Sequence, residues 1–413
     1  MLDRGDALVE PLEAAHTLLE VVEPVARACH RGEHLVAAGS VADPLNRLLA
    51  EVGETIHDAL SGLSHGRIVP QVKAVALVTV LAALLGAAAT PRKPVTVTVM
   101  TRNLYLGANL DPIVKAKSLP DALNAVAADW AQVQANDFPV RARAIAREIG
   151  TVKPDIVGFQ EAVLYRTQTP PDFTATPSTH VALDYVAELR KALAARKLKY
   201  RFVAVAPWTD AELPSGSPAT MDIRLTVRDA LLVRVEKKLR IKRVRKVQYA
   251  TVTPLIKDVV TAKRGYVVAD ATMNGRAFRV ATTHLESFDD TSQVAQGKQL
   301  GQALAAGKVP TVLLGDLNSR ADGTGTPTHA NLLALGFADA WPEVHPNELG
   351  LTCCHGDDLR ELGGPFYSRI DYVLLKNGFR AVAAGIVGQK PSDRIGGLWP
   401  SDHAGVWARL TLP

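Results

Sequence analysis

Cysteine is scarce in this sequence, with three residues in 413. Three thiols are too few for the disulfide framework that small secreted domains use to supplement a small core. Cys353 and Cys354 are adjacent, and neighbouring cysteines rarely bridge each other without strain. A zinc site built from this pair and His355 is disfavoured, because consecutive side chains point apart. We therefore expect the pair to be buried or to form part of a turn.

Aromatic residues are also few, at 5% of the chain. Enzymes that act on membranes need exposed aromatic or apolar hairpins to enter the lipid interface, and the sequence presents no such hairpin. The strongest charge run, Arg234–Lys246, has no aromatic residue among its basic ones, which argues against a base-stacking platform. This run either follows a nucleic-acid backbone or, as we favour, forms the solvated face of an edge strand.

The bulk composition sets few other limits. Hydrophobic residues make up 47% and charged residues 22%, which is typical of a globular protein with a large core. The net charge of +5 permits a polyanionic substrate without requiring one. We find no internal repeat and no low-complexity segment.

The longest apolar run covers Ala74–Ala89, which is short for a helix that crosses a membrane. Lys73 precedes it and small residues end it, so residues 73–89 have the pattern of a secretory signal peptide, with a buried helix or a membrane anchor as the alternative. A signal peptide belongs at the start of a chain. We therefore hypothesise that translation begins near Val72, that residues 1–71 are an over-extended or poorly ordered leader, that residues 72–90 are the signal, and that the product is secreted.

Six short motifs follow in order along the rest of the chain, and each ends an apolar run. They are MTRNLYLG with Asn103, DIVGFQE with Glu161, VATTHLES with His284, LLGDLNS with Asp316 and Asn318, RIDYVLL with Asp371, and SDHAGVW with Asp402 and His403. Apolar, β-branched runs predict strands, so these polar residues should meet at one rim of a sheet. Carboxylates, histidines and asparagines gathered there suit a hard cation and a phosphate.

The segments between the motifs predict helices and loops. Helices are expected at Leu123–Gln134, Val140–Ile149, Val181–Arg196, Ser292–Ala306 and Thr328–Gly336, and residues 165–180 should form a loop. Strands in hairpins, mixed with crossover helices, predict two packed sheets with helices outside.

Each motif residue has a simpler explanation when it is taken alone. A strand-end residue such as Glu161 is usually just solvated, although a bare carboxylate beside a buried strand is costly without a cation. The sequence Asp-Leu-Asn-Ser at Asp316 favours an Asx-turn. A lone histidine is more often structural, but His403 directly follows Asp402 and precedes a strand. Six motifs in one order favour the functional interpretation.

The set resembles the endonuclease/exonuclease/phosphatase superfamily, the fold of deoxyribonuclease I, inositol polyphosphate phosphatases and bacterial sphingomyelinases, over roughly residues 95–413. The resemblance implies an α/β fold, a four-layer sandwich of two mixed β-sheets flanked by helices, in a catalytic domain over residues 91–413. It also implies hydrolysis of phosphate esters with Mg²⁺, for which Mn²⁺ can substitute, by in-line attack of water without a covalent intermediate.

The resemblance assigns roles to the motif residues. Asn103, Glu161 and Asp402 are the expected metal residues. Asp316 orients and polarises the attacking water, and Asn318 contacts the phosphate and fixes Asp316.

The two histidines carry the remaining roles that the resemblance implies. Asp371 holds His403 in its charged form, as a phosphate ligand or a base. His284 acts as a general acid or a phosphate ligand, and abasic-site endonucleases use a tyrosine region in its place, so repair of abasic sites ranks low. Asp229 stands where the family usually has asparagine and is left out of the set. Arg369 either anchors Asp371 or the phosphate, or is a plain surface residue.

The substrate is the open question. We favour a secreted phosphodiesterase acting on nucleic acid, monomeric and without a stable protein partner, on the mild basic charge and the deoxyribonuclease-like His284. A sphingomyelinase or inositol-phosphate phosphatase is the alternative, and a binding protein that kept the fold is the non-enzymatic one. The loop Ala338–Gly364 is expected to border the substrate groove and to influence specificity.

Overall fold

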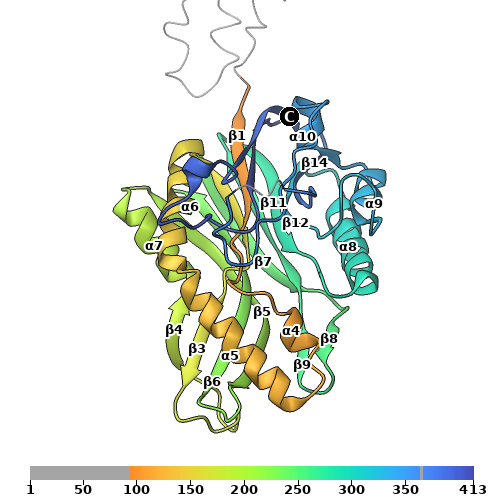
Figure 1. Cartoon of the computed structure of the whole chain (residues 1–413). Helices are drawn as coiled ribbons and strands as arrows, with labels where there is room; N and C mark the ends of the chain where they lie inside the picture. The colour runs from red at the N-terminus through yellow and green to blue at the C-terminus, as the bar shows by residue number, and fades with distance from the viewer. Residues whose placement is uncertain (1–93, 363–365) are drawn as a thin grey trace, which may run out of the picture. The chain divides into compact units, whose positions relative to one another are not determined.

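The computed structural model describes residues 94–362 and 366–413, all within one compact unit, Pro94–Pro413 (Figure 1). The predicted leader over 1–71, the start near Val72 and the predicted signal segment over 72–90 lie outside the described residues. Within the described part, no helix is long and apolar enough to span a bilayer.

Two β-sheets form the centre of this unit. The first sheet has the order β15-β16-β1-β2-β6-β3-β4, and β5 pairs with β6. Its strands are β1 (Thr96–Asn103), β2 (Ile156–Gln160), β3 (Leu164–Gln168), β4 (His180–Asp184), β5 (Tyr200–Ser215), β6 (Met221–Arg234), β15 (Arg380–Val387) and β16 (Gly405–Thr411).

The second sheet has the order β13-β14-β12-β11-β10-β7, and β8 and β9 form a separate hairpin. These strands are β7 (Leu239–Gln248), β8 (Thr253–Ile256), β9 (Val260–Ala262), β10 (Gly265–Met273), β11 (Arg276–His284), β12 (Thr311–Asp316), β13 (Ala338–Asp339) and β14 (Asp371–Lys376). Both sheets mix parallel and antiparallel pairs, since β1 is parallel to β2 and β11 to β12.

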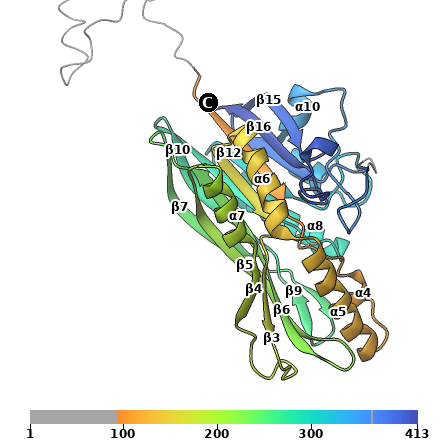
Figure 2. The same ribbon diagram turned by 60° about the vertical axis from the view of Figure 1, so that its left-hand side comes forward.

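Helices cover the outer faces of the two sheets (Figures 1 and 2). A buried cluster joins the first group of helices to the first sheet, and another joins the second group to the second sheet. The first group is α5 (Leu119–Ala135), α6 (Phe138–Val152) and α7 (Tyr185–Ala195), and the second is α8 (Asp290–Ala305) and α9 (Thr328–Ala334). The short elements are α4 (Asp111–Val114), α10 (Ala340–Val344) and the 3₁₀ turn η1 (Pro391–Asp393).

A third apolar cluster lies between the sheets and is formed by alternate residues of facing strands. Val97 and Val99 of β1 and Val312 and Leu314 of β12 are members, all fully buried. Each such side chain stabilises the fold by roughly 1.5–3 kcal/mol relative to exposure. The layers are therefore helix, sheet, sheet, helix, and the predicted four-layer α/β sandwich is confirmed.

One predicted helix is wrong over its first residues. Val181–Arg196 was expected to be helical, but residues 180–184 form β4, which pairs with β3 inside the expected loop 165–180. The helix begins only after Asp184, whose side chain accepts a hydrogen bond from the backbone N–H of Val186. Pairing with β3 therefore overrides the helical pattern up to the residue that caps α7.

The sheets approach each other closely just behind the rim where the motif residues lie. A Cβ atom added to Gly158 of β2 would lie 2.8 Å from Cβ of Thr282 on β11. Beside it, Gln160 donates to Thr282 Oγ1 at 2.9 Å and accepts from Thr101 Oγ1 at 3.1 Å. The absence of a side chain at Gly158 and the buried hydrogen bonds of Gln160 thus set the distance between the two sheets.

We predict that Gly158→Ala lowers the free energy of unfolding by about 1–3 kcal/mol, because the added methyl group overpacks the contact between the sheets. Chemical denaturation measures the change. Gly150→Ala in α6 is the matched control, since its Cβ would meet nothing closer than 3.4 Å and alanine favours a helix. Equal effects of the two substitutions would contradict the close approach.

Candidate active site

The eight predicted site residues come from strand ends of both sheets and meet at one rim. In the second sheet the register places His284 opposite Asp316 and Asp316 opposite Asp371, so three neighbouring strands present them in a row. In the first sheet, Asn103 ends β1 and Glu161 follows β2, the strand that runs parallel to it. The prediction that strand ends gather these residues is confirmed by the register.

Asn103 connects the two sheets through a single side-chain amide. Its Nδ2 donates to Glu161 Oε1 at 3.2 Å and to Asp316 Oδ2 at 3.0 Å. Its Oδ1 accepts from the backbone N–H of Tyr105 at 2.9 Å. Glu161 is held from its other side, where Oε2 accepts from the backbone N–H of Leu106 at 2.6 Å. Both carboxylates are therefore fixed in place by N–H donors.

Asp371 and His403 form a buried carboxylate–imidazole pair, with 2.9 Å between Oδ2 and Nδ1. Burial acts to lower the pKa of His403, but the carboxylates of Asp371, Asp402 and Asp316 outweigh it and hold that pKa well above 6.5. Because Asp371 occupies Nδ1, the ring presents Nε2 to Asp316 Oδ2 at 3.8 Å and to Asp402 Oδ1 at 4.0 Å. The imidazole is therefore positively charged toward the rim.

His284 is in the opposite state. Its Nδ1 lies 3.0 Å from Nη1 of Arg264, and a guanidinium can only donate, so Nε2 carries the ring proton. Burial and the positive charges of Arg264 and His403 hold the pKa of His284 well below 6.5. Nε2–H faces Asp316 Oδ2 at 3.5 Å and Glu161 Oε1 at 3.9 Å. The neutral ring is thus a hydrogen-bond donor aimed at the rim.

The carboxylates of the rim are crowded and short of positive charge. Burial and the neighbouring Asp371 raise the pKa of Asp316 to about 7, although His403 opposes the shift. Burial raises the pKa of Asp402 to about 6, again against the pull of His403. Among the described residues, Asp371 Oδ1 is buried without a hydrogen-bond partner. An oxygen-rich set with an unmatched acceptor fits a hard divalent cation.

Among the described residues, two groups of side chains lie close enough to hold a metal ion, and the one with carboxylates differs from the predicted one. One oxygen each of Asp316 and Asp371 and a ring nitrogen of His403 lie within 4.8 Å of one another. The predicted metal residues, Asn103, Glu161 and Asp402, border this group rather than coincide with it. Asn103 and Glu161 meet it through Asp316, and Asp402 meets it through His403.

Asn318 supports Asp316 in the way that an Asx-turn does. Its backbone N–H donates to Asp316 Oδ1 at 2.9 Å, so the simpler explanation considered for this sequence also holds. Its side-chain Nδ2 donates to the carbonyl oxygen of Leu285 at 2.9 Å, which ties the loop after β12 to the loop after β11. Asn318 adopts a positive φ of 47°, which asparagine tolerates better than most residues.

Two buried arginines hold the rim, and sequence reasoning missed both. Arg102 pairs with Glu148 of α6 at 3.0 Å and donates to the carbonyl oxygen of His403. Arg141 of α6 donates to the carbonyl oxygens of Leu104 and Pro400, at 2.6 and 3.2 Å. For Arg102 the available signal was a charged residue directly before Asn103 in a strand of otherwise uncharged residues.

The loop Ala338–Gly364 borders the site, as expected, through its described residues up to 362. Thr352 Oγ1 accepts from the backbone N–H of Asp371 at 3.3 Å, and the N–H of His355 donates to the carbonyl oxygen of Asp402 at 2.8 Å. Cys353 is buried, as expected of the pair, and the structure joins it to Cys354 by a disulfide. Cys353 bridges to both Ser368 and His403 in the backbone, and the two Sγ atoms and a ring nitrogen of His403 lie within 4.8 Å of one another.

Three other features singled out in the sequence are not part of the rim. Arg369 pairs with Asp339 and packs over Tyr372, and it makes no ion pair with Asp371 among the described residues. Asp229 is buried and accepts from Trp208 Nε1 at 2.8 Å. The basic run lies mainly on β7, the last strand of its sheet, and the favoured edge-strand interpretation is confirmed. The exposed basic residues of β7 are Arg240, Lys242, Arg243, Arg245 and Lys246.

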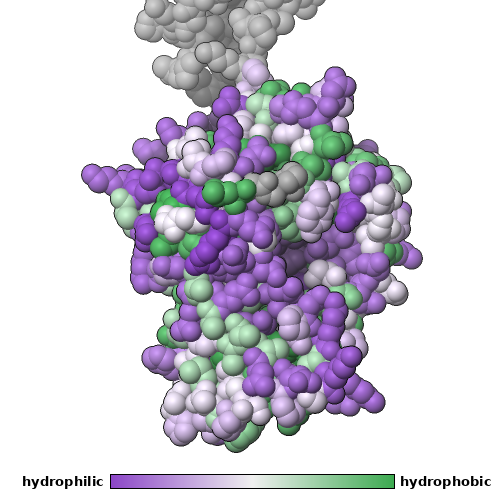
Figure 3. All heavy atoms as spheres, viewed as in Figure 1, coloured by the Kyte–Doolittle hydropathy of each residue, from purple (hydrophilic) through white to green (hydrophobic). Residues whose placement is uncertain are grey.

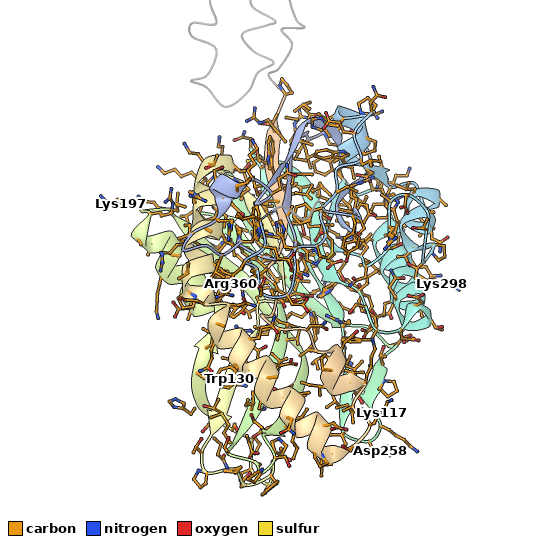
Figure 4. The ribbon with its side chains drawn as sticks, viewed as in Figure 1. Lys117, Trp130, Lys197, Asp258, Lys298 and Arg360 are labelled. Carbon is orange, nitrogen blue, oxygen red and sulfur yellow. A yellow bond between two sulfur atoms is a disulfide. The ribbon has the colours of Figure 1, made fainter. Side chains whose placement is uncertain are left out.

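Side chains fill the space between the ribbons around this rim, and hydrophilic residues cover the middle of the face seen in Figures 3 and 4. Arg360 lies near the centre of that face in Figure 4, where its Nη1 donates to the main-chain carbonyl of Asp358.

Comparison with known proteins gives one family. The sequence model of the Endonuclease/Exonuclease/phosphatase family matches residues 128–403. A crystal structure of a protein of this family from Bacteroides thetaiotaomicron is 16% identical, covers 78% of this chain and 99% of its own, and has a TM-score of 0.51. At this identity the likeness shows the fold alone.

Two further solved structures have lower TM-scores. A mannosyl-6-phosphatase from Bacteroides thetaiotaomicron is 16% identical, covers 76% of this chain and 100% of its own, and has a TM-score of 0.48. TDP2 from D. rerio, complexed with a single-strand DNA product, is 15% identical, covers 77% and 99%, and has a TM-score of 0.46. A comparison with curated proteins finds no match.

The crowded carboxylates predict a pH dependence of stability. Asp316 has a folded-state pKa of about 7 against an ordinary 3.8, so the folded protein binds this proton more tightly than the unfolded chain does. The stabilisation is present at low pH and is lost as the pH rises toward about 7. In the presence of a chelator, the free energy of unfolding should therefore fall between about pH 4.5 and 7.5 by on the order of 2 kcal/mol more in the wild type than in Asp316→Asn.

Denaturant titration at both pH values measures this difference. Asp322→Asn is the control, because Asp322 is exposed in the following loop and its pKa is lowered by hydrogen bonds from Thr324. That variant should keep the wild-type loss. An equal loss in Asp316→Asn would show that Asp316 is not the group responsible.

Proposed function

The chain belongs to the endonuclease/exonuclease/phosphatase family, and on that premise we propose that it is a divalent-metal-dependent phosphoester hydrolase. The observation that carries the proposal is the rim itself. A charged His403 and a neutral Nε2–H of His284 both face Asp316, at 3.8 and 3.5 Å. A positive charge, a neutral donor and a carboxylate around one point are what a phosphate and its attacking water require.

The metal we propose is Mg²⁺, with Mn²⁺ as a substitute, held by Asn103, Glu161 and Asp402. These residues border the group of Asp316, Asp371 and His403, whose protonated ring donates hydrogen bonds and leaves no nitrogen free for a cation. When bound, the cation neutralises phosphate charge and helps to make water nucleophilic. The unmatched oxygen of Asp371 and the raised pKa values of Asp316 and Asp402 support a missing positive charge at this rim.

The chain's own residues supply the remaining chemistry. Asp316 orients the attacking water and accepts its proton, a task that suits a carboxylate with a pKa of about 7. Asn103 and the backbone N–H of Asn318 fix the two oxygens of Asp316. Asn318 also contacts the phosphate.

The two histidines face the charge that develops on the phosphate. His403 is held charged by Asp371, which suits a phosphate ligand rather than a base. His284 donates from Nε2 as a neutral phosphate ligand, because Arg264 occupies Nδ1. Water attacks in line, and no covalent intermediate forms.

Nucleic acid is the substrate class that we favour. The net charge of +5 and the deoxyribonuclease-like His284 support this choice. A sphingomyelinase or inositol-phosphate phosphatase is the second candidate. The observation in its favour is that Leu349, Leu362 and Tyr367, in and beside the loop that borders the site, are 73%, 78% and 62% exposed.

We also propose that the protein is monomeric and that it is secreted. The apolar segment 73–89 supports secretion. N-terminal sequencing of protein recovered from the culture medium tests the export. A mature N-terminus before residue 70 would contradict a signal at that position.

We predict that Asp316→Ala abolishes hydrolysis, with a loss of about 10²-fold or more, while the protein stays folded. The assay uses the full chain with Mg²⁺ against plasmid DNA, RNA, sphingomyelin, inositol phosphates and bis-p-nitrophenyl phosphate. Asp322→Ala is the matched control and should keep wild-type turnover, because Asp322 is exposed and contacts only its own loop.

Nicking of plasmid that depends on Asp316 would support the nuclease. Cleavage of sphingomyelin or inositol phosphate alone would favour the second candidate. Unchanged turnover in Asp316→Ala would refute the assigned site. Silence on every substrate, with Mg²⁺ bound, would favour a binding protein that has kept the fold.

We predict that thorough chelation silences the enzyme and that Mg²⁺ or Mn²⁺ restores it. Mg²⁺ should also raise the melting temperature of chelated wild type, and less so that of Glu161→Gln, because the amide lacks the charge that attracts the cation. Glu188→Gln, at a surface pair with Lys191, is the control and should respond like the wild type. Activity that survives chelation would exclude the metal-dependent mechanism.

A further inference from the structure

A pair of sulfur atoms lies against the histidine of the site. The Sγ atoms of Cys353 and Cys354 and a ring nitrogen of His403 are all within 4.8 Å of one another. The two cysteines are joined as a disulfide. Neither has a place in the hydrolytic chemistry described above, so the pair calls for its own explanation.

The backbone holds this pair firmly in position. Cys353 is buried and exchanges backbone hydrogen bonds with Ser368, at 3.0 and 3.1 Å. On its other side it bridges to His403, and the carbonyl oxygen of Thr352 accepts from the N–H of Ala404 at 2.7 Å. Cys354 is partly exposed. A reagent in solution can therefore reach one sulfur while the backbone keeps the pair beside the imidazole.

Two donor sets of different chemistry meet at His403. Asp316 and Asp371 offer oxygen, which suits hard cations such as Mg²⁺. Cys353 and Cys354 offer sulfur, which as thiolate selects soft or borderline cations such as Zn²⁺. Only the reduced pair provides thiolates, so the sulfur set exists in one redox state and is absent in the other.

We propose that Cys353, Cys354 and His403 form a redox-controlled site for a thiophilic divalent cation such as Zn²⁺. Two small thiols reduce the pair: the S–S bond breaks, each cysteine gains one electron and one proton, and the small thiols leave as their own disulfide. The cation then displaces the two thiol protons and the Nε2 proton of His403, and it is bound by two thiolates and the imidazole. A small disulfide reverses the exchange: its S–S bond breaks and takes up two electrons, two small thiolates leave, the Cys353–Cys354 bond forms, and the cation is released.

The cation binds His403 through Nε2, since Asp371 occupies Nδ1. That nitrogen cannot hold a cation and also carry the proton that it presents to Asp316. Reduced protein with Zn²⁺ is therefore inactive, whereas oxidised protein at the same low Zn²⁺ hydrolyses normally. This consequence rests on the proposed function, but the binding itself does not.

The test measures cation binding directly with Co²⁺, whose complexes with thiolates absorb strongly in the near ultraviolet. The full chain carries Cys29→Ser, so that Cys353 and Cys354 are its only cysteines. Protein reduced by a phosphine should bind one Co²⁺ per chain and show the sulfur-to-cobalt band. Oxidised protein, and reduced Cys353→Ser or Cys354→Ser, should lack the band, and His403→Asn should shift it and weaken binding.

Absence of the band in reduced protein would overturn the site. An unchanged band and affinity in His403→Asn would remove His403 from it. Free thiols in the unfolded, oxidatively purified chain would show that the pair is not bonded and would overturn the redox control. Because the spectrum does not depend on turnover, these outcomes remain decisive even if no substrate is cleaved.

Discussion

The crowding of negative charge at a buried rim is the constraint on which the rest of this structure depends. Asp316 and Asp371 are buried and Asp402 is partly buried, and one oxygen of Asp371 has no partner among the described residues. Burying such groups is costly unless charge and hydrogen bonds compensate. The chain supplies part of this compensation through His403 and the amide of Asn103, and a cation would supply the remainder. The negative charge of the rim is thus only partly compensated without a ligand, and this favours the binding of a cation.

A rigid frame keeps these groups from relaxing apart. The Arg102–Glu148 pair ties β1 to α6 and reaches the carbonyl oxygen of His403, while Arg141 ties the same helix to the loop after Asn103. Between the sheets, the absence of a side chain at Gly158 fixes their spacing. These contacts resist the repulsion between the carboxylates of the rim. The site is therefore preorganised for a phosphate and a cation.

The rim was predictable because strand ends are visible in a sequence and a parallel or antiparallel register brings them together. Asn103, Glu161, His284, Asp316, Asp371 and His403 were all found in this way. Contacts between side chains from different segments of the chain were not predictable, which is why the pairing of Arg264 with His284 and of Arg369 with Asp339 went unseen. The short strand β4 was missed because five residues of mixed pattern cannot be told from a helix start without their partner β3. The Cys353–Cys354 bond depends on how one loop turns, which residue types do not determine.

The edge strand β7 has a consequence for how copies of this protein meet. A final strand has backbone donors and acceptors free on its outer side, which invites another strand to add to the sheet. Two copies joining there would bring two rows of arginine and lysine together, and their repulsion opposes that addition. Ionic strength screens such repulsion. Salt usually weakens contacts between oppositely charged surfaces, but at this edge it would weaken the repulsion that opposes strand addition. We therefore expect less association of copies through β7 at low ionic strength than at high ionic strength.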